Sequence, residues 1–193
     1  MRAAILREPK SNLEIEERAV PTPGHGEVLI RVRACGVCHG DLMVRNGEFP
    51  FVRFPIVPGH EVVGVVESLG TGVTHPKTGT RVGVPWLYSA CGHCNHCIKG
   101  DDVLCADGQY VGMMRDGGYQ EFMLARSDYV LPLPEALGFS DAAPLMCAGL
   151  SVYGGLYHAG FKPGDKVAVP FSDSAAWGRW PSSSREQWAD AWR

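Results

Sequence analysis

Four cysteines lie close together in one short stretch of the chain, CGHCNHCIKGDDVLC. The first three are spaced C-x2-C-x2-C, and a short loop separates the third from the fourth. Thiolates spaced in this way can surround one Zn²⁺ tetrahedrally, and four protein ligands leave no position for a substrate. Disulfides are the weaker alternative, because cysteines three apart are poorly placed to bridge each other. The sequence therefore predicts a structural zinc site formed by Cys91, Cys94, Cys97 and Cys105.

The composition is that of an ordinary globular protein. Of the 193 residues, 45% are hydrophobic and 20% are charged, and the net charge is −3. A slightly acidic chain has no basic surface, which argues against nucleic acid as a partner. The first ten residues, MRAAILREPK, contain no long apolar run, so neither a signal peptide nor a membrane anchor is expected. We therefore expect a cytoplasmic protein whose cysteines are ligands or free thiols.

Short segments with alternating apolar and polar side chains favour a mainly β fold with some helix. The 24 glycines and 14 prolines are spread along the chain, which also suits a loop-rich β domain. Strands are predicted over residues 1–6, 13–18, 27–35, 61–69, 81–86, 120–125, 129–133 and 166–169. Helix is predicted over residues 41–46, ended by Gly47, and over 142–157 with Ser140 as the N-cap. A tight KPGD turn is expected before the last strand.

A second possible metal site is scattered along the chain. Cys38, His60 and Cys147 would supply two thiolates and one imidazole, and a three-ligand zinc keeps a position open for water or substrate. The residues alone leave an alternative open. A histidine in an apolar run is often a core residue, and Cys147 could be a small buried hydrophobe.

Several motifs together resemble the zinc-containing alcohol dehydrogenase family, the medium-chain dehydrogenases. The segment GHEVVGVVESLGTGV, at residues 59–73, resembles the zinc motif of that family. The segments CGVCHGD, the four-cysteine stretch, GGYQEF and CAGLSVY resemble further family motifs in the same order. The resemblance covers residues 1–169, and several independent motifs make it specific.

The resemblance implies a GroES-like β-barrel catalytic domain over residues 1–150, with a zinc-binding lobe at 88–108. Residues 151–169 would form the helix and first strand that lead into a dinucleotide-binding domain. We expect that Rossmann domain to be essentially absent, because residues 170–193 contain no glycine-rich fingerprint. A shifted reading frame of the same segment can encode that fingerprint, so residues 170–193 are interpreted as an aberrant, frameshifted tail.

The resemblance also assigns roles to individual residues. Cys38, His60 and Cys147 would hold the catalytic zinc, and Glu61 would be a neighbouring or alternate ligand. Asp41 would orient the His60 ring by accepting its other N–H. Trp86 would line the substrate pocket, or else be an ordinary core residue. His39 would lie near the cofactor pyrophosphate, or else be a solvated loop residue. Cys35 is expected to be a buried structural thiol.

Two positions depart from the family pattern. Gly40 stands where many members have a serine or threonine that relays the alcohol proton, and Met43 replaces a relay histidine found in some members. The proton would therefore leave through water or another group, with His39 as a candidate.

The function implied is reversible hydride transfer between a primary or secondary alcohol and NAD or NADP. Two zinc ions per chain, one catalytic and one structural, a small alcohol, aldehyde or ketone substrate, and a homo-oligomeric parent are expected. The 193-residue chain is predicted to be inactive on its own. The alternative is a non-enzymatic, zinc-bound GroES-like binding module.

Overall fold

The computed structural model describes residues 1–167. The chain divides into two units, one over Met1–Cys147 and a second that begins at Ala148. The predicted tail over residues 170–193 and the end of the predicted strand at 166–169 lie outside the described residues.

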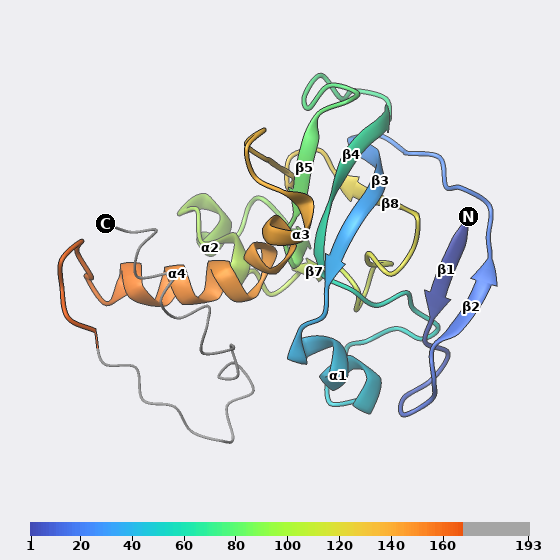
Figure 1. Ribbon diagram of the computed structural model, residues 1–193, viewed down its shortest axis with the longest axis horizontal. Helices are drawn as coiled ribbons and strands as arrows, with labels where there is room; N and C mark the ends of the chain where they lie inside the picture. Colours follow the sequence, from blue (N-terminus) through green and yellow to red (C-terminus); the bar gives the residue numbers. More distant parts are fainter. Residues whose placement is uncertain (168–193) are drawn as a thin grey trace. The chain divides into compact units, whose positions relative to one another are not determined.

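A five-stranded antiparallel sheet forms the centre of the first unit (Figure 1). Its strand order is β8-β3-β4-β5-β9. The strands are β3 (Glu27–Gly36), β4 (Glu61–Leu69), β5 (Arg81–Val84), β8 (Phe122–Arg126) and β9 (Leu131–Pro132). All five correspond to strands predicted from the alternating pattern, and the mainly β fold with some helix is confirmed.

The main core lies on one face of this sheet. Side chains of successive strand residues point to opposite faces, so Val28 and Ile30 of β3 share a face and are fully buried. They pack in one cluster with valines of the neighbouring strands, among them Val62, Val66 and Val82. This burial of branched side chains stabilises the sheet that carries the functional residues.

Gly64 marks a close backbone approach between β3 and β4. A Cβ atom at this position would lie 2.3 Å from the carbonyl oxygen of Arg31, so only glycine fits without displacing backbone. The strand pairing also shifts here, since Val32 pairs with Gly64 but Ala34 pairs with Val63. The shifted pairing and the close backbone approach both mark Gly64 as the irregular point of this strand pair.

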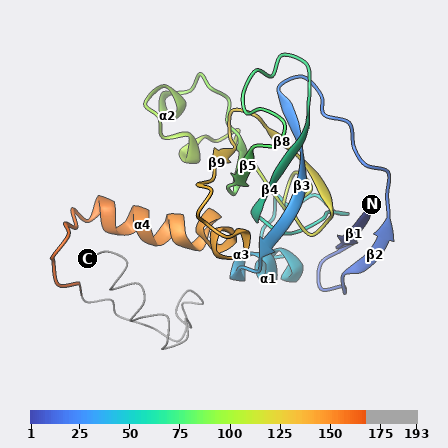
Figure 2. The same cartoon turned by 45° about the horizontal axis from the view of Figure 1, so that its top comes forward.

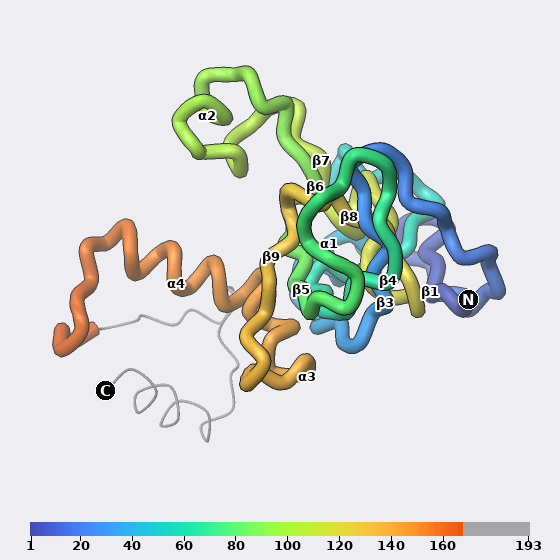
Figure 3. Tube along the Cα trace, turned by 90° about the horizontal axis from the view of Figure 1, so that it is seen from above, coloured from blue at the N-terminus to red at the C-terminus, as the bar shows by residue number. Residues whose placement is uncertain are grey.

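Two small hairpin-like sheets and a lobe complete the first unit. Strands β1 (Arg2–Ile5) and β2 (Glu14–Glu17) pair at the edge seen in Figure 1. Strands β6 (Leu87–Ser89) and β7 (Gln109–Tyr110) were not predicted, because two or three residues show no periodicity. The segment between them contains α2 (Asn95–Ile98) and the 3₁₀ turn η1 (Asp102–Leu104), and it projects away from the sheet (Figures 2 and 3).

The predicted long helix is wrong in its continuity and in its N-cap. The structure replaces the single helix 142–157 by α3 (Phe139–Ala142), the 3₁₀ helix η2 (Ala143–Met146) and α4 (Ala148–His158). The N-cap of α3 is Gly138, not Ser140. Pro144 lacks the N–H that would continue the α-helical hydrogen bonds from α3, and Cys147 has φ −134° and ψ −73°, outside the helical region. The interruption places Cys147 between elements instead of inside a helix.

The predicted helical turn at residues 41–46 is a longer helix, α1 (His39–Asn46), and Gly47 ends it with φ 76° as expected. In the second unit, the KPGD turn is confirmed, because the Lys162 amide donates to the Asp165 carboxylate at 2.8 Å. Lys166 and Val167 form no strand. None of the helices within residues 1–167 combines the length and apolarity needed to cross a bilayer.

Candidate metal centres

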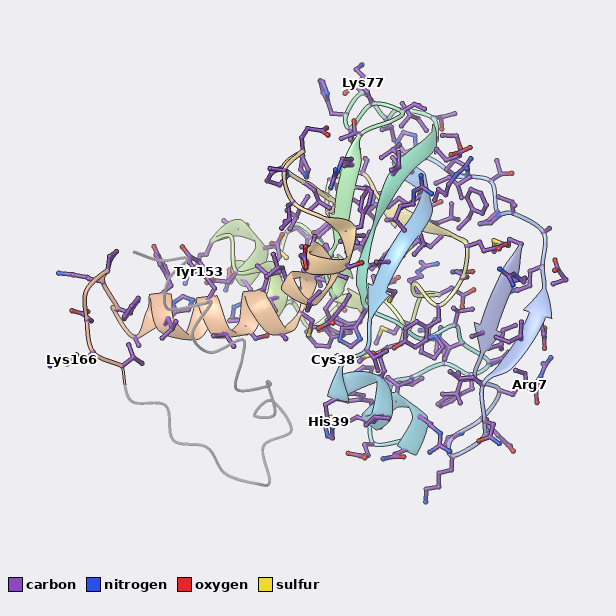
Figure 4. All side chains as sticks on the ribbon, viewed as in Figure 1. Arg7, Cys38, His39, Lys77, Tyr153 and Lys166 are labelled. Carbon is purple, nitrogen blue, oxygen red and sulfur yellow. The ribbon has the colours of Figure 1, made fainter. Side chains whose placement is uncertain are left out.

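The register between β3 and β4 brings the first two residues of the scattered site together. Gly36, the last residue of β3, pairs with Glu61, the first residue of β4. Cys38 lies two residues after Gly36, and His60 directly precedes Glu61. Both therefore lie at the same end of the sheet. Cys38 is the N-cap residue of α1 and lies where β3 leads into that helix (Figure 4). Both side chains are buried, with exposed fractions of 8% for Cys38 and 2% for His60.

Cys147 reaches this place at the end of η2. Its Sγ lies 3.9 Å from the Sγ of Cys38. One donor atom from each of Cys38, His60 and Cys147 lies within 4.8 Å of the other two. Two sulfurs and an imidazole nitrogen are ligands that Zn²⁺ accepts readily, and three ligands fit a site with an open position. The donor set therefore suits a zinc ion with one open position.

Asp41 is the buried carboxylate that orients this site. Its Oδ1 lies 3.1 Å from Nδ1 of His60 and also accepts the amide of Gly59 at 3.1 Å. Its Oδ2 accepts the amide of Cys38 at 2.9 Å and the hydroxyl of Tyr119 at 3.0 Å. With Nδ1 of His60 bound to Asp41, Nε2 is the ring nitrogen left to face the sulfurs. The fold therefore brings the Asp41 carboxylate into contact with the His60 ring.

The protein groups alone polarise one another strongly. A hydrogen bond from Cys147 is the largest influence on Cys38 and lowers the pKa of its thiol to about 4. The same bond, together with burial, raises the pKa of Cys147. Burial is the largest single influence on His60 and opposes its charged form, but the hydrogen bonds and negative charges of Asp41 and Cys38 together outweigh it and raise the pKa of His60 to about 9. The site therefore favours a thiolate at Cys38, which is the form that binds metal.

Other predicted site residues lie outside this set of donors. Glu61 is buried, with 3% exposed, but its carboxylate is not among the donor atoms that come together. His39 is exposed at the start of α1 (Figure 4). Gly40 lies against the His60 ring, since a Cβ there would be 3.0 Å from Cε1. A larger residue at position 40 would therefore press on the imidazole.

The four cysteines of the lobe also gather at one point. Donor sulfurs of Cys91, Cys94, Cys97 and Cys105 all lie within 4.8 Å of one another, and none is in a disulfide. Backbone amides point at the sulfurs, with the Cys94 amide 3.4 Å from Sγ of Cys91. The backbone amides of His93 and Cys94 lower the pKa of Cys91 to about 6. The donor set suits a closed, structural Zn²⁺ site.

Trp86 and Cys35 occupy packed positions. The Trp86 ring stacks on Tyr110 with centroids 4.2 Å apart, and its ring N–H donates to the sulfur of Met113 at 3.4 Å. Trp86 packs against the second hydrophobic cluster, built around Leu6 and Val44. This packing is what the alternative of an ordinary core residue describes. Cys35 packs against the main core, and burial raises the pKa of its thiol to about 12.

Sequence analysis missed Tyr119 as a partner of the site. This residue lies in the GGYQEF segment, more than seventy positions beyond Asp41 in the chain. A tyrosine beside two glycines gives no signal of its own, because only folding shows which carboxylate its hydroxyl meets.

Comparison with known proteins agrees with this fold. Residues 24–135, more than half of the chain, match the family described as "Alcohol dehydrogenase GroES-like domain". An alcohol dehydrogenase of Geobacillus stearothermophilus is 49% identical over 170 residues, which are 88% of this chain and 50% of that protein. The chain thus spans about half the length of the curated relatives it matches.

Solved structures give the same result. A cobalt- and zinc-bound thermostable alcohol dehydrogenase from Pyrobaculum aerophilum superposes with a TM-score of 0.78 at 34% identity, covering 86% of this chain and 50% of that one. Acetophenone reductase from Geotrichum candidum in complex with NAD gives 0.74 at 32% identity, covering 84% and 48%.

The antiparallel sheet, the cysteine-rich lobe and the buried Cys–His–Cys cluster define a GroES-like catalytic domain of the medium-chain dehydrogenase type. The chain belongs to the alcohol dehydrogenase family, which confirms the resemblance found in its sequence motifs.

Proposed function

We propose that this chain carries the catalytic domain of a zinc-dependent alcohol dehydrogenase that uses NAD or NADP. The observation that carries the proposal is the convergence of Cys38, His60 and Cys147 from three distant segments, with Asp41 holding His60. Related structures support the cofactors, since one is cobalt- and zinc-bound and another is in complex with NAD. The substrate would be a small alcohol and the product an aldehyde or ketone.

Zn²⁺ held by these three residues would act as a Lewis acid toward the substrate oxygen, and the nicotinamide would exchange hydride with the substrate carbon. The protein groups set up this chemistry. Asp41 fixes the His60 tautomer, and the depressed pKa of Cys38 supplies a thiolate. Gly40 offers no hydroxyl, so the substrate proton leaves through water or through a group such as the exposed His39.

Cys91, Cys94, Cys97 and Cys105 would hold a second, structural zinc, for two ions per chain. Glu61, buried beside the catalytic ligands, keeps its role as a neighbouring or alternate ligand in this proposal. A cytoplasmic location is also part of it, because seven unpaired cysteines suit a reducing compartment. The intact enzyme would be a homo-oligomer.

Cobalt substitution tests the proposal without depending on turnover. The chain is loaded with Co²⁺, and its visible spectrum is recorded with and without imidazole, a small ligand that binds open metal positions. A three-ligand site predicts a spectral change on adding imidazole, and Cys147→Ser abolishes that change while Cys97→Ser does not. No change would mean that both sites are closed, and would favour a non-enzymatic binding module.

A further inference from the structure

We propose that Arg81 is a positioning residue for the catalytic metal site, because it fixes the segment that ends in Cys147. This inference rests on the proposed function, in which Cys147 is a metal ligand. Arg81 lies on β5, which pairs with β4. Strand β4 begins at Glu61, the residue that follows His60.

Arg81 holds alternate residues of one segment. Its carbonyl oxygen accepts the amide of Leu133 at 2.9 Å. Its guanidinium donates through Nη1 to the carbonyl of Glu135 at 3.1 Å and through Nη2 to the carbonyl of Leu137. The guanidinium carbon also lies 4.3 Å from the centroid of the Phe139 ring. The Arg81 side chain thus contacts residues 135, 137 and 139, and the Arg81 backbone binds residue 133.

The segment beyond Phe139 cannot place Cys147 by itself. It consists of α3 and η2, each only four residues long. Helices this short are not stable in isolation, so their position comes from tertiary contacts. Arg81 contacts the residues that lead into α3 and also Phe139, the first residue of α3, so it fixes where this segment begins.

β5 provides a second contact close to the ligand. A Cβ at Gly83 would lie 2.2 Å from Sδ of Met146, so Met146 packs directly on the bare backbone of this strand. Met146 is 6% exposed and adjoins Cys147 in the chain. The segment is therefore held to β5 near both of its ends, and Arg81 supplies the polar part of that attachment.

The chemistry requires arginine at this position. The planar fork of a guanidinium can donate to two carbonyls while its face covers an aromatic ring. A lysine at the same place keeps the charge but has a single ammonium group and cannot hold this geometry. The guanidinium is largely shielded from water, with 20% of the side chain exposed, so its hydrogen bonds are not simply replaced by solvent.

The test uses Arg81→Lys and Arg81→Met in the full 193-residue chain, loaded with cadmium and followed by ¹¹³Cd NMR during competition with a chelator. A four-thiolate site and a two-thiolate, one-imidazole site give separate resonances, so each affinity is measured alone. We expect both variants to weaken cadmium binding at the Cys38 site by about tenfold or more, and to leave the four-cysteine site unchanged.

Arg31→Lys is the matched control. Arg31 lies on the same sheet, forks onto Glu67 at 2.8 Å and 3.1 Å, and covers the Phe122 ring at 5.4 Å, but it does not touch the Cys147 segment. Unchanged affinity in Arg81→Lys would overturn the inference, and so would an equal loss in Arg31→Lys or an equal loss at both metal sites. If Arg81→Met does not fold, Arg81→Lys decides.

Cys147→Ser separates this inference from the function on which it rests. If Cys147→Ser removes the cadmium resonance of the Cys38 site while Arg81→Lys leaves the affinity of that site unchanged, the Cys38 metal site stands and the role of Arg81 fails. If Cys147→Ser leaves the resonance unchanged, the proposed metal site itself fails.

Discussion

The hydroxyl of Tyr119 donates a hydrogen bond of 3.0 Å to Oδ2 of Asp41, whose other carboxylate oxygen lies 3.1 Å from Nδ1 of His60. A chain of hydrogen bonds therefore runs from a tyrosine outside the metal cluster, through a buried carboxylate, to one of the candidate ligands. Its members come from different parts of the fold, so each can be tested separately.

Tyr119→Phe is expected to weaken metal binding at the Cys38 site by a few-fold. The substitution keeps the ring and removes one hydrogen bond to a carboxylate, a loss of about 1–3 kcal/mol of which only part reaches the metal. Chelator competition measures the affinity. Tyr88→Phe is the control, because its hydroxyl also donates to a carboxylate, Glu27, which is not part of the Cys38 site. Equal effects of the two substitutions would contradict the prediction.

Asp41→Asn is expected to lower metal affinity at the same site by about 10–100-fold, since an amide cannot accept from every group that now donates to the carboxylate. Asp41→Ala should also destabilise the fold, because buried donors on Cys38, Gly59 and His60 lose their acceptor at about 1–3 kcal/mol each. Urea unfolding measures the stability. Asp116→Asn, which affects an amide of Val57 outside the site, should leave metal affinity unchanged.

Gly64→Ala is expected to destabilise the chain by about 1–3 kcal/mol, because the added methyl group meets the carbonyl oxygen of Arg31 at 2.3 Å and backbone must move. The shift of the urea midpoint measures the loss. Gly155→Ala in α4 is the contrasting substitution, since within residues 1–167 no atom beyond its chain neighbours and its own helix backbone lies within 4 Å of the added Cβ. Alanine is the better helix former, so a small gain is expected there. A midpoint unchanged by Gly64→Ala would show that the strands separate without cost.

Removing metal should loosen the four-cysteine lobe and leave the sheet intact. Lys99 is exposed within this lobe, and its segment has few elements of its own to hold it. Chelator treatment should therefore speed tryptic cleavage after Lys99. Cleavage after Lys77, an exposed residue in the turn before β5 (Figure 4), is the internal control and should not change. Equal acceleration at both lysines would indicate general unfolding instead of a local zinc lobe.

The 193-residue chain by itself is predicted to give no alcohol-dependent reduction of NAD or NADP. Hydride transfer requires a nicotinamide held against the substrate, and this chain spans about half the length of the curated relatives it matches. Absorbance of the reduced cofactor measures turnover in zinc-loaded protein. Catalysis at an ordinary enzymatic rate, lost in Cys38→Ser, would contradict this prediction.

Local patterns in the sequence determined much of the fold. Each of the five central strands was predicted, because alternation of apolar and polar residues follows directly from the pleat of a strand. The four-cysteine lobe was equally accessible, since its members lie within one short loop and their spacing alone limits what they can do. The break at Pro144 was missed, because apolar residues on both sides of it imitate one continuous helix.

The scattered metal site was decided by tertiary structure. No spacing relates Cys38, His60 and Cys147, and only the resemblance to a family connected them beforehand. In the fold, the pairing of Gly36 with Glu61 sets Cys38 beside His60, and the contacts of Arg81 and Gly83 with residues 133–146 bring in Cys147. Strand register and side-chain packing depend on residues far apart in the chain, so the sequence by itself named the chemical groups while the tertiary structure set their distances.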